Sequence, residues 1–442
     1  MTYAEDLEKA QQILKDWKGD RYSFGGGALK AVGGYAAEFG PKTMLVVDGI
    51  DQDWMAPTLD AVQKSLAENQ LDPGLPASGA RPNAPREDVY RLALEIMRRK
   101  PDSIVAVGGG STIDAVKGAA VLATWTPDEV KKHLEASDTD AGGVDPFLGV
   151  DTVAKISRAT GKGMLPVVAV QMASSSAAHL TKYSNITDPV SGIKKLIIDM
   201  AIVPPAAVFD YGVTASAPPE LTLDGALDGI SHVWEVAMGG TGRDFLDEVT
   251  ELARIAVSLI VHNLPKALKD PSDIDARTGL GLATDLGGRS IMVGGTNGGH
   301  LGSFQLVSYL SHGRACHILN PYYTVLFAPA IQKQLRAVGP IYQQAGYIES
   351  GINLAELSGT DLARTVAGGM TAFARSLGFP TTLKEAGVPQ ERIEVMVEQA
   401  KNPQLASKLQ NMPTPMETAD VDPKMDPTLQ AAFTGDFSLI PE

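Results

Sequence analysis

The sequence predicts an N-terminal α/β domain followed by an all-helical C-terminal domain. Short apolar runs alternate with helix-length segments in the first half of the chain, which is typical of a parallel sheet covered by helices. After residue 212 the strand pattern stops and the apolar spacing becomes helical. The 442 residues are also too many for one ordinary hydrophobic core. We therefore expect an α/β domain over 1–212 and an all-helical domain over 213–442.

Four apolar runs in the first half are predicted to form buried strands. Each run ends at a glycine, an aspartate or another polar residue, as strands of a parallel sheet commonly do. The runs are TMLVVD (43–48), SIVAVGGG (103–110), PVVAVQ (166–171) and AAVFD (206–210). The segment 84–100 between the first two runs has apolar residues at a spacing of about 3.6, which predicts a helix on the sheet.

The second half is expected to consist of helices that break at glycine and proline. Apolar residues follow a helical spacing over 244–270, 353–378 and 391–401. The proline- and methionine-rich tail from Asn402 onward lacks this spacing, so we expect an irregular wrap over the surface there.

Composition and charge exclude several classes of function. The net charge of −14 disfavours a nucleic acid or an anionic membrane as partner, because like charges repel. Nowhere do about 18 apolar residues follow one another, so no membrane span is expected. The single cysteine, Cys316, cannot form an internal disulfide, and the N-terminus lacks the apolar core of a signal peptide. We expect a cytoplasmic protein with no nucleic-acid or membrane partner.

A glycine-rich turn ends the predicted strand over 103–110. Gly108, Gly109, Gly110 and Ser111 lie directly before the next predicted helix. Backbone N–H groups in such a turn can approach an anion, and the N-terminus of the helix adds partial positive charge. Turns at the carboxyl ends of parallel strands bind nucleotides in α/β proteins. The alternative is a plain tight turn, in which Ser111 and Asp114 form an S-x-x-D capping arrangement.

Asp48 closes the first predicted strand. An acid at this place accepts hydrogen bonds from an adenosine ribose and repels a 2′-phosphate, so it favours NAD over NADP. The alternative is an ordinary strand-end aspartate that begins a turn.

Two pairs of residues in the second half form a candidate metal site. Asp228 and His232 lie four residues apart in a predicted helix and share one face, and Asp224 is an alternative oxygen ligand one turn earlier. His300 and His312 are about 18 Å apart along a straight helix, so they share an ion only if the chain bends between them. The glycines at 298, 299, 302 and 313 predict such an interruption. One carboxylate and three neutral imidazoles suit Fe²⁺ or Zn²⁺.

His317 follows Cys316 close to the second pair. It is a candidate for relaying a proton at the site, and the alternative is a histidine with a purely structural role.

Three of these stretches together resemble the iron-containing (group III) alcohol dehydrogenases. GGGSTIDAVK (108–117) resembles the family's GGGSxxDxxK element, and SAPPELTLDGALDGISH (216–232) resembles its LPPxL…DxxxH element. SHGRACHILNPYY (311–323) is similar to its histidine-rich stretch with an HG turn, and the likeness runs in order over about residues 20–400. The resemblance implies an N-terminal dinucleotide-binding α/β domain and an all-helical metal-binding domain, with the active site in the cleft between them.

The resemblance also implies an activity, the reversible oxidation of a small-molecule alcohol to an aldehyde or ketone. Fe²⁺ is the implied metal, with Zn²⁺ as the alternative, and NAD is the implied cofactor, with NADP as the alternative. Homodimers are common in the family, so a homodimer is expected. The implied metal ligands are Asp228, His232, His300 and His312. The implied cofactor-binding residues are Asp48, Gly109, Gly110, Ser111, Asp114, Ser176 and Lys194.

Two departures from the family pattern affect the site. The family's TTxGTGSE loop is here MASSSAAHL (172–180), in which Ser174 to Ser176 still offer hydroxyl groups and His179 stands where an acid is common. The family also commonly has two histidines before the HG turn, whereas this chain has only His300 there. The resemblance therefore assigns no acid–base residue, and His317 is the candidate.

Two other functions remain compatible with the sequence. A dehydroquinate-synthase-like lyase or a glycerol-1-phosphate dehydrogenase shares the architecture but needs several cations for a phosphorylated substrate. Arg289 and Arg314 are the only arginines or lysines over 289–330. The second alternative is a metal- and nucleotide-binding sensor without turnover.

Overall fold

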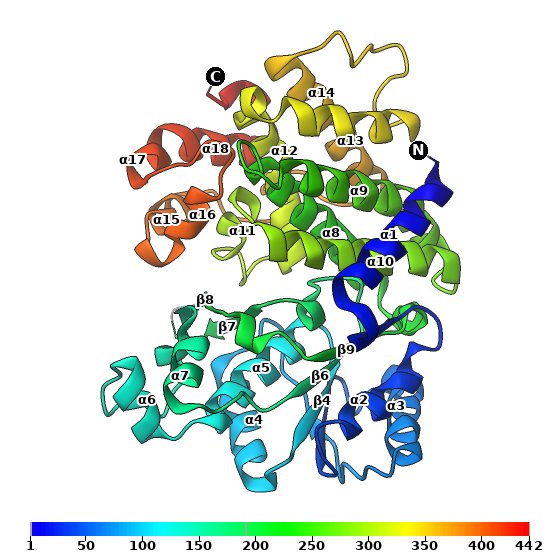
Figure 1. The fold of residues 1–442 in the computed structure, drawn as a ribbon. Coiled ribbons are helices and arrows are strands. Elements are labelled where there is room, and N and C mark those ends of the chain that lie inside the picture. The colour runs from blue at the N-terminus through cyan, green and yellow to red at the C-terminus, as the bar shows by residue number, and fades with distance from the viewer. Residues whose placement is uncertain (1, 191, 442) are drawn as a thin grey trace. The chain divides into compact units, whose positions relative to one another are not determined.

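The computed structural model describes residues 2–190 and 192–441. The chain forms two compact units, Leu14–Pro218 and Met1–Ile13 with Pro219–Glu442. They are referred to below as the sheet unit and the helical unit, and Figure 1 shows the elements of each. The division differs from the predicted boundary at 212/213, because the turns of 3₁₀ helix over Tyr211–Ser216 stay with the sheet unit and α8 begins only at Pro219.

The first residues of the chain belong to the helical unit, whereas the sequence placed them in the α/β domain. They form the first turns of α1 (Tyr3–Lys18), which lie against α9 (Leu246–Lys269). Arg254 donates a 2.7 Å hydrogen bond to Asp6. Lys9 donates one of 2.6 Å to Glu251. These partners are far apart in sequence, so no local pattern indicated that they meet.

Six parallel strands form the main sheet, in the order β1-β9-β6-β4-β2-β3. The four predicted strands are confirmed and are neighbours at its centre: β2 (Thr43–Val47), β4 (Ser103–Gly108), β6 (Val167–Gln171) and β9 (Ala206–Phe209). The short edge strands β1 (Tyr22–Phe24) and β3 (Ala77–Ser78) lie outside the four predicted runs. Central parallel strands are buried on both faces, which explains their continuous apolar runs.

Side chains alternate along β2 toward two hydrophobic clusters, one on each face of the sheet. Met44 and Val46 belong to one cluster, and Leu45 and Val47 belong to the other. This alternation follows from the two-residue period of a strand. Helices that contribute apolar residues to these clusters include α4 (Arg86–Arg99) and α5 (Gly110–Thr124) on the first face and α2 (Val32–Ala37) and α3 (Ala56–Glu68) on the second.

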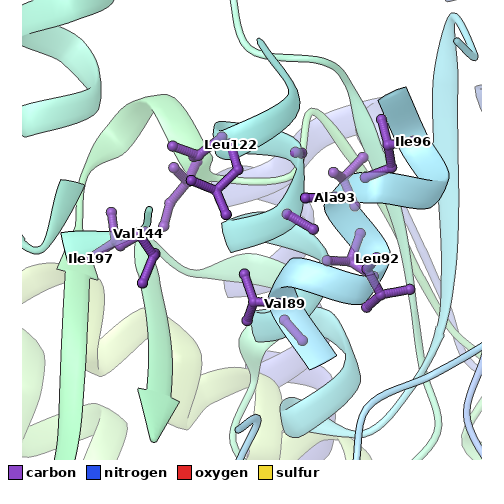
Figure 2. Packing of buried hydrophobic residues seen from close by; sticks show 14 of the residues in the cluster. Val89, Leu92, Ala93, Ile96, Leu122, Val144 and Ile197 are labelled. Atoms are coloured by element: carbon purple, nitrogen blue, oxygen red, sulfur yellow. The ribbon is translucent and has the colours of Figure 1, made fainter. Parts of the chain in front are cut away.

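The predicted helix over 84–100 is α4, and its apolar side is shown in Figure 2. Val89, Leu92, Ala93 and Ile96 recur at helical spacing and are buried in the first cluster. Burying a valine, leucine or isoleucine side chain fully contributes about 1.5–3 kcal/mol, which exceeds the differences in helix propensity between residues. This packing therefore fixes α4 on the sheet.

A second sheet in the same unit has three strands in the order β5-β8-β7. β7 (Tyr183–Asp188) and β8 (Ile193–Ile198) pair antiparallel, and Thr187 lies opposite Lys194. β7 is mostly polar, so the apolar pattern did not predict it. The remaining strand and helices of the sheet unit are β5 (Gly149–Val150), α6 (Pro127–Leu134) and α7 (Thr152–Thr160).

Over the described residues from Pro219 onward the chain forms helices and no strand, as the sequence predicts. α8 (Pro219–Gly239) is buried along most of its length and packs against α9, α10 and α12. Trp234 on α8 donates a 2.8 Å hydrogen bond to Thr324 on α12. The other helices before the tail are α10 (Ile274–Val293), α11 (Gly298–Ser303), α12 (His312–Leu326), α13 (Gln332–Gln344), α14 (Gly359–Ser376) and α15 (Arg392–Ala400).

The prediction of an irregular tail is wrong. The tail, drawn in orange to red in Figure 1, forms α16 (Ala406–Gln410), α17 (Thr418–Asp420), a π-helical turn (Val421–Met425) and α18 (Asp426–Thr434). Its prolines interrupt the apolar spacing, although Met416 and Val421 are fully buried. Among the described residues, none of the helices has the length and apolar content that crossing a membrane requires.

Candidate functional site

Four side chains from three helices of the helical unit converge on one point. Asp228 and His232 lie one turn apart on α8, His300 lies on α11, and His312 is the first residue of α12. One donor atom of each residue lies within 4.8 Å of those of the other three. The two oxygens of Asp228 are each 4.0 Å from an Nε2 atom, one of His232 and one of His312. Donors this close can hold one ion after a small inward shift, since the distance from such an ion to each ligand is about 2 Å. These four residues are referred to as the ligand cluster.

The imidazoles of the ligand cluster pack against one another. The rings of His232 and His300 stack with centroids 4.9 Å apart, and His300 meets His312 edge to face at 5.1 Å. Burial lowers the pKa of His232 to about 4, and the charge of Asp228 offsets only part of this effect. A neutral imidazole keeps the lone pair that a cation needs. Both ring nitrogens of His312 lie 3.9 Å from Cys316 Sγ.

A buried carboxylate, Glu235, orients His300 by bonding to its Nδ1 atom, which leaves Nε2 for the ligand cluster. Its Oε1 accepts hydrogen bonds from His300 Nδ1 at 2.8 Å and Asn320 Nδ2 at 3.1 Å, and its Oε2 accepts from the N–H groups of Asn297 and His300. Burial alone would raise the pKa of Glu235, but His300 and the Asn297 N–H hold it below its ordinary value. With Nδ1 bonded to Glu235, His300 Nε2 is buried without a hydrogen-bond partner among the described residues. This donor atom fits a cation.

The helix interruption between His300 and His312 is confirmed. α11 ends three residues after His300, and α12 begins at His312. Gly313 is required by close packing as well as by the bend. A Cβ on it would lie 2.2 Å from the carbonyl oxygen of Asp224 and 2.7 Å from Asp228 Cβ. The absence of a side chain at this position lets α12 approach α8 closely enough for the two ligand pairs to meet.

The alternative oxygen ligand, Asp224, is engaged elsewhere. One of its oxygens accepts hydrogen bonds of 3.1 and 2.9 Å from the Arg314 guanidinium, and the other accepts one of 2.5 Å from the Ser311 hydroxyl. Asp228 is therefore the carboxylate that faces the three imidazoles. Asp224 instead ties α8 to the start of α12.

His317 lies five residues after His312 on α12, which is about 140° around the helix. Its ring is buried edge to face against Phe379, at 5.6 Å between centroids. Burial lowers its pKa to about 4. The helix therefore directs His317 and His312 to different surroundings.

Sequence reasoning missed Glu235. It lies three residues after His232, on the same face of α8, so the helical spacing could have indicated it. The missing signal was its partner, because nothing local indicates that His300 bonds to this carboxylate.

In the sheet unit, the glycine turn (residues 108–111) joins the end of β4 to the start of α5. Asp48, at the end of β2, accepts hydrogen bonds from the N–H groups of Gly109 and Gly49, and burial raises its pKa. Space is open beside Gly109, whereas a Cβ on Gly110 would lie 2.5 Å from Ser176 Oγ. The turn is thus bounded by an acid on one side and by the 172–180 loop on the other.

The capping interpretation of Ser111 and Asp114 is wrong. No side-chain capping bond occurs at the N-terminus of α5. Ser111 Oγ accepts a 3.0 Å bond from the N–H of Asn83. Asp114 accepts bonds of 3.0 and 2.9 Å from the N–H and side-chain amide of Asn185, so it ties α5 to β7. Lys194 on β8 is buried, and its charge acts on Asp114.

Lys117, the last residue of the GGGSTIDAVK stretch, is fully buried and holds the polypeptide that follows β6. Its ammonium donates to the carbonyl oxygens of Ala178, Thr181 and Tyr183 at 2.6, 2.9 and 2.9 Å. Burial lowers the pKa of Lys117 to about 8. The loop over 172–183 is thereby fastened to α5.

That loop adopts a demanding backbone conformation. Ser176 and Ala177 both have left-handed backbone angles, with φ of 60° and 49°. A residue with a side chain adopts this region at a cost of about 1 kcal/mol, which glycine avoids. Ala177 stands where the family pattern has a glycine, so the loop keeps the glycine conformation without the glycine.

Comparison with known proteins gives one consistent family. Residues 19–211 match the iron-containing alcohol dehydrogenase family, and residues 222–423 match the C-terminal domain of the Fe-containing alcohol dehydrogenases. The chain is 26% identical over 388 residues to the NAD-dependent methanol dehydrogenase of Bacillus methanolicus, an alignment that covers 85% of this chain and 90% of that protein. It is 28% identical over 360 residues to the NADPH-dependent butanol dehydrogenase of Clostridium saccharobutylicum, with 81% and 84% covered.

The fold is similar to a solved structure of the alcohol dehydrogenase from Oenococcus oeni, with a TM-score of 0.77, 21% identity, and 94% of this chain and 98% of that chain covered. Because both halves of the sequence match the two parts of one family in order, the chain belongs to the iron-containing alcohol dehydrogenase family.

Proposed function

We propose that the chain is a metal-dependent, nicotinamide-linked alcohol dehydrogenase that interconverts a small alcohol and its aldehyde or ketone. The observation that supports this proposal most is the ligand cluster, in which one carboxylate and three imidazoles converge. The buried Nε2 of His300, which has no hydrogen-bond partner among the described residues, is accounted for by a cation at this point. Family membership supports the class of reaction.

The proposed reaction is a balanced hydride transfer. The alcohol gives a hydride from its carbinol carbon to C4 of the nicotinamide and a proton to solvent, so NAD⁺ becomes NADH and the alcohol becomes a carbonyl compound. A divalent cation supplies Lewis acidity when bound, which stabilises negative charge on the alcohol oxygen. Asp228, His232, His300 and His312 would hold this cation. Glu235 would keep the proton of His300 on Nδ1.

Fe²⁺ is the proposed metal and Zn²⁺ is the alternative. Three nitrogen donors and one oxygen donor suit either ion. The name of the family supports iron.

NAD is the proposed cofactor, with NADP as the alternative. The negative charge of Asp48 at the end of β2 supports NAD because it repels a 2′-phosphate. We propose that the glycine turn (Gly109, Gly110 and Ser111) and Ser176 contact the cofactor. Asp114 and Lys194, which are buried, are proposed to support the surrounding loops.

We further propose a structural role for His317, which its burial against Phe379 supports. A homodimer and a cytoplasmic location are also part of the proposal. The family resemblance supports the homodimer, and the single cysteine supports a reducing compartment. Light scattering after size-exclusion chromatography tests the homodimer, and cell fractionation tests the location.

The decisive experiment incubates the purified protein anaerobically with Fe²⁺ or Zn²⁺, NADH and a panel of small aldehydes. A dehydrogenase consumes one NADH for each alcohol formed. A lyase of the dehydroquinate-synthase type would turn over without net NADH consumption, and a sensor would bind both ligands without turnover. The pairing of Arg314 with Asp224 and of Arg289 with Glu248 argues against a phosphorylated substrate, because both guanidinium groups already have a carboxylate partner.

A further inference from the structure

A lysine from the tail lies beside the helix that carries His300. Lys408 on α16 donates a hydrogen bond from its ammonium to the hydroxyl of Thr296, just before α11. The same ammonium lies over the ring of Phe304, just after α11, at 5.7 Å from the ring centroid. Lys408 therefore contacts both ends of α11.

Hydrogen bonds between the tail and the residues just before α11 hold Lys408 in this position. Asn411 Nδ2 donates a 3.3 Å hydrogen bond to the carbonyl oxygen of Thr296, and the carbonyl oxygen of Asn411 accepts one of 3.2 Å from Asn297 Nδ2. A Cβ on Gly295 would lie 1.9 Å from Asn411 Nδ2, so a larger residue there would displace the Asn411 amide. The tail is thus fastened to the loop that leads into α11.

Lys408 and residues in and around the ligand cluster affect one another's pKa values. Burial lowers the pKa of Lys408 to about 8, and the charges of Glu235 and Cys316 offset part of this effect. In turn, Lys408 is one of the groups that lower the pKa of His232. Together with the contacts to Thr296 and Phe304 on either side of α11, these effects support an electrostatic interaction between the ammonium and the ligand cluster.

A substrate with its own negative charge would complete the charge balance. With a divalent cation bound, the two carboxylates Asp228 and Glu235 would balance only the charge of the cation, so the group that includes Lys408 would carry one net positive charge. Lys408 is partly buried, and a net charge that is partly removed from water is costly unless an opposite charge lies nearby. Of its three N–H donors, the described residues account for one, through Thr296. A carboxylate on the substrate would supply both the missing charge and the acceptors.

We propose that Lys408 selects substrates that carry a carboxylate or a similar anionic group a few atoms from the reacting carbon. The substrate class is then short hydroxy acids and the matching oxo acids, in which the anionic group takes no part in the hydride transfer. One ammonium suits one carboxylate, whereas a phosphate monoester would need more cations. This inference rests on the proposed dehydrogenase function and specifies its substrate.

The test compares succinic semialdehyde with its methyl ester, which lacks only the negative charge. For the metal-loaded wild-type protein with NADH, we expect a higher kcat/KM for the acid than for the ester. In Lys408→Met the ratio of the two values should fall about 10- to 100-fold, as expected for one charged hydrogen bond. Lys408→Arg should restore most of the ratio because it keeps the charge. A wild-type ratio at or below unity, or an unchanged ratio in Lys408→Met, overturns the inference.

Lys401→Met is the matched control, since Lys401 pairs with Glu398 and Asp422 in the same part of the chain. It should keep the wild-type ratio. Thermal unfolding of each variant checks that it is folded.

Binding of butyrate to the metal-free protein, measured by titration calorimetry, gives a second readout without turnover. We expect weaker binding in Lys408→Met than in the wild type, and equal binding contradicts the role of Lys408. A wild type that binds butyrate through Lys408 but reduces neither aldehyde refutes the proposed function alone. A wild type that reduces acid and ester equally well refutes the specificity inference alone.

Discussion

The ligand cluster and the glycine turn differ in which part of the polypeptide forms the candidate site, the side chains or the backbone. In the ligand cluster the side chains are the site, and three helices place four donor atoms within 4.8 Å of one another. At the glycine turn the shape and the N–H groups of the backbone form the candidate site, while the nearby charged residues Asp114 and Lys117 are buried in structural bonds. Substitutions should therefore affect activity first in the ligand cluster and stability first around the turn.

The largest effect is expected for His300→Ala. This change removes one of three imidazoles and takes one of the hydrogen-bond donors away from the buried carboxylate of Glu235. Loss of the cation should lower kcat/KM by about a thousandfold or more, since Lewis-acid stabilisation is worth several kcal/mol. Metal analysis and steady-state kinetics measure both consequences. His133→Ala on α6 is the control and should keep wild-type values. Full activity of His300→Ala without bound metal would contradict the role of the cluster.

Lys117→Met should act mainly on stability. The three carbonyl oxygens that Lys117 contacts would lose their donor, which costs about 3 kcal/mol. Urea unfolding measures this loss, and the KM for NAD should rise because the 172–183 loop is released. The metal content should stay at the wild-type level, because Lys117 lies in the sheet unit. The exposed Lys155 on α7 provides the control Lys155→Met. A variant with wild-type stability would show that the buried ammonium is not needed.

The two neighbouring glycines, Gly109 and Gly110, allow two properties of the turn to be tested separately. One is the close packing of the turn against Ser176, and the other is the open space beside the turn. Gly110→Ala should destabilise the protein by about 1–3 kcal/mol, because the new methyl group overlaps Ser176. Gly109→Ala should leave unfolding nearly unchanged, since the space beside it is open. If a cofactor phosphate binds at the turn, the methyl group of Gly109→Ala should raise the Kd for NAD. Calorimetric NAD binding and thermal unfolding of both variants measure this contrast, and the same behaviour in both would remove it.

The smallest effect, on stability, is expected for Glu251, which pairs with Arg254 and Lys9 outside both sites. Arg254, Lys9 and their hydrogen bonds lower the pKa of Glu251 to about 2. Its contribution to stability is therefore present above the unfolded value of 4.5 and is lost as the pH falls toward 2. Partial exposure limits it to about 1 kcal/mol. Thermal unfolding of the wild type and Glu251→Gln should differ at neutral pH and converge in acid. A difference that persists in acid would exclude this linkage.

The central strands and the ligand cluster could largely be predicted from the sequence, because the patterns that indicate them are local. Apolar runs identified the four central strands, and the spacing of Asp228 and His232 indicated a shared helix face. The distance between His300 and His312 required a break, and α11 and α12 have one. In each case the period of a helix or strand links the sequence to the geometry.

What could not be predicted depends on contacts between segments that are distant in sequence. Nothing around Lys408 indicates that it meets Thr296, and nothing around Asp6 indicates that it meets Arg254. Asp114 fits a capping pattern in the sequence, yet it accepts a hydrogen bond from Asn185 on β7. The apolar pattern did not predict β7, because most of its residues are polar. Tertiary partners, rather than local pattern, decide the roles of these polar side chains.

The only cysteine of the chain gives a built-in reporter of how the ligand cluster opens. Cys316 is fully buried beside His312, so a thiol reagent can modify it only when α12 moves away from its neighbours. The rate of labelling would then measure that opening in the unaltered protein, without an introduced probe. A bound cation that joins α8, α11 and α12 should slow the labelling.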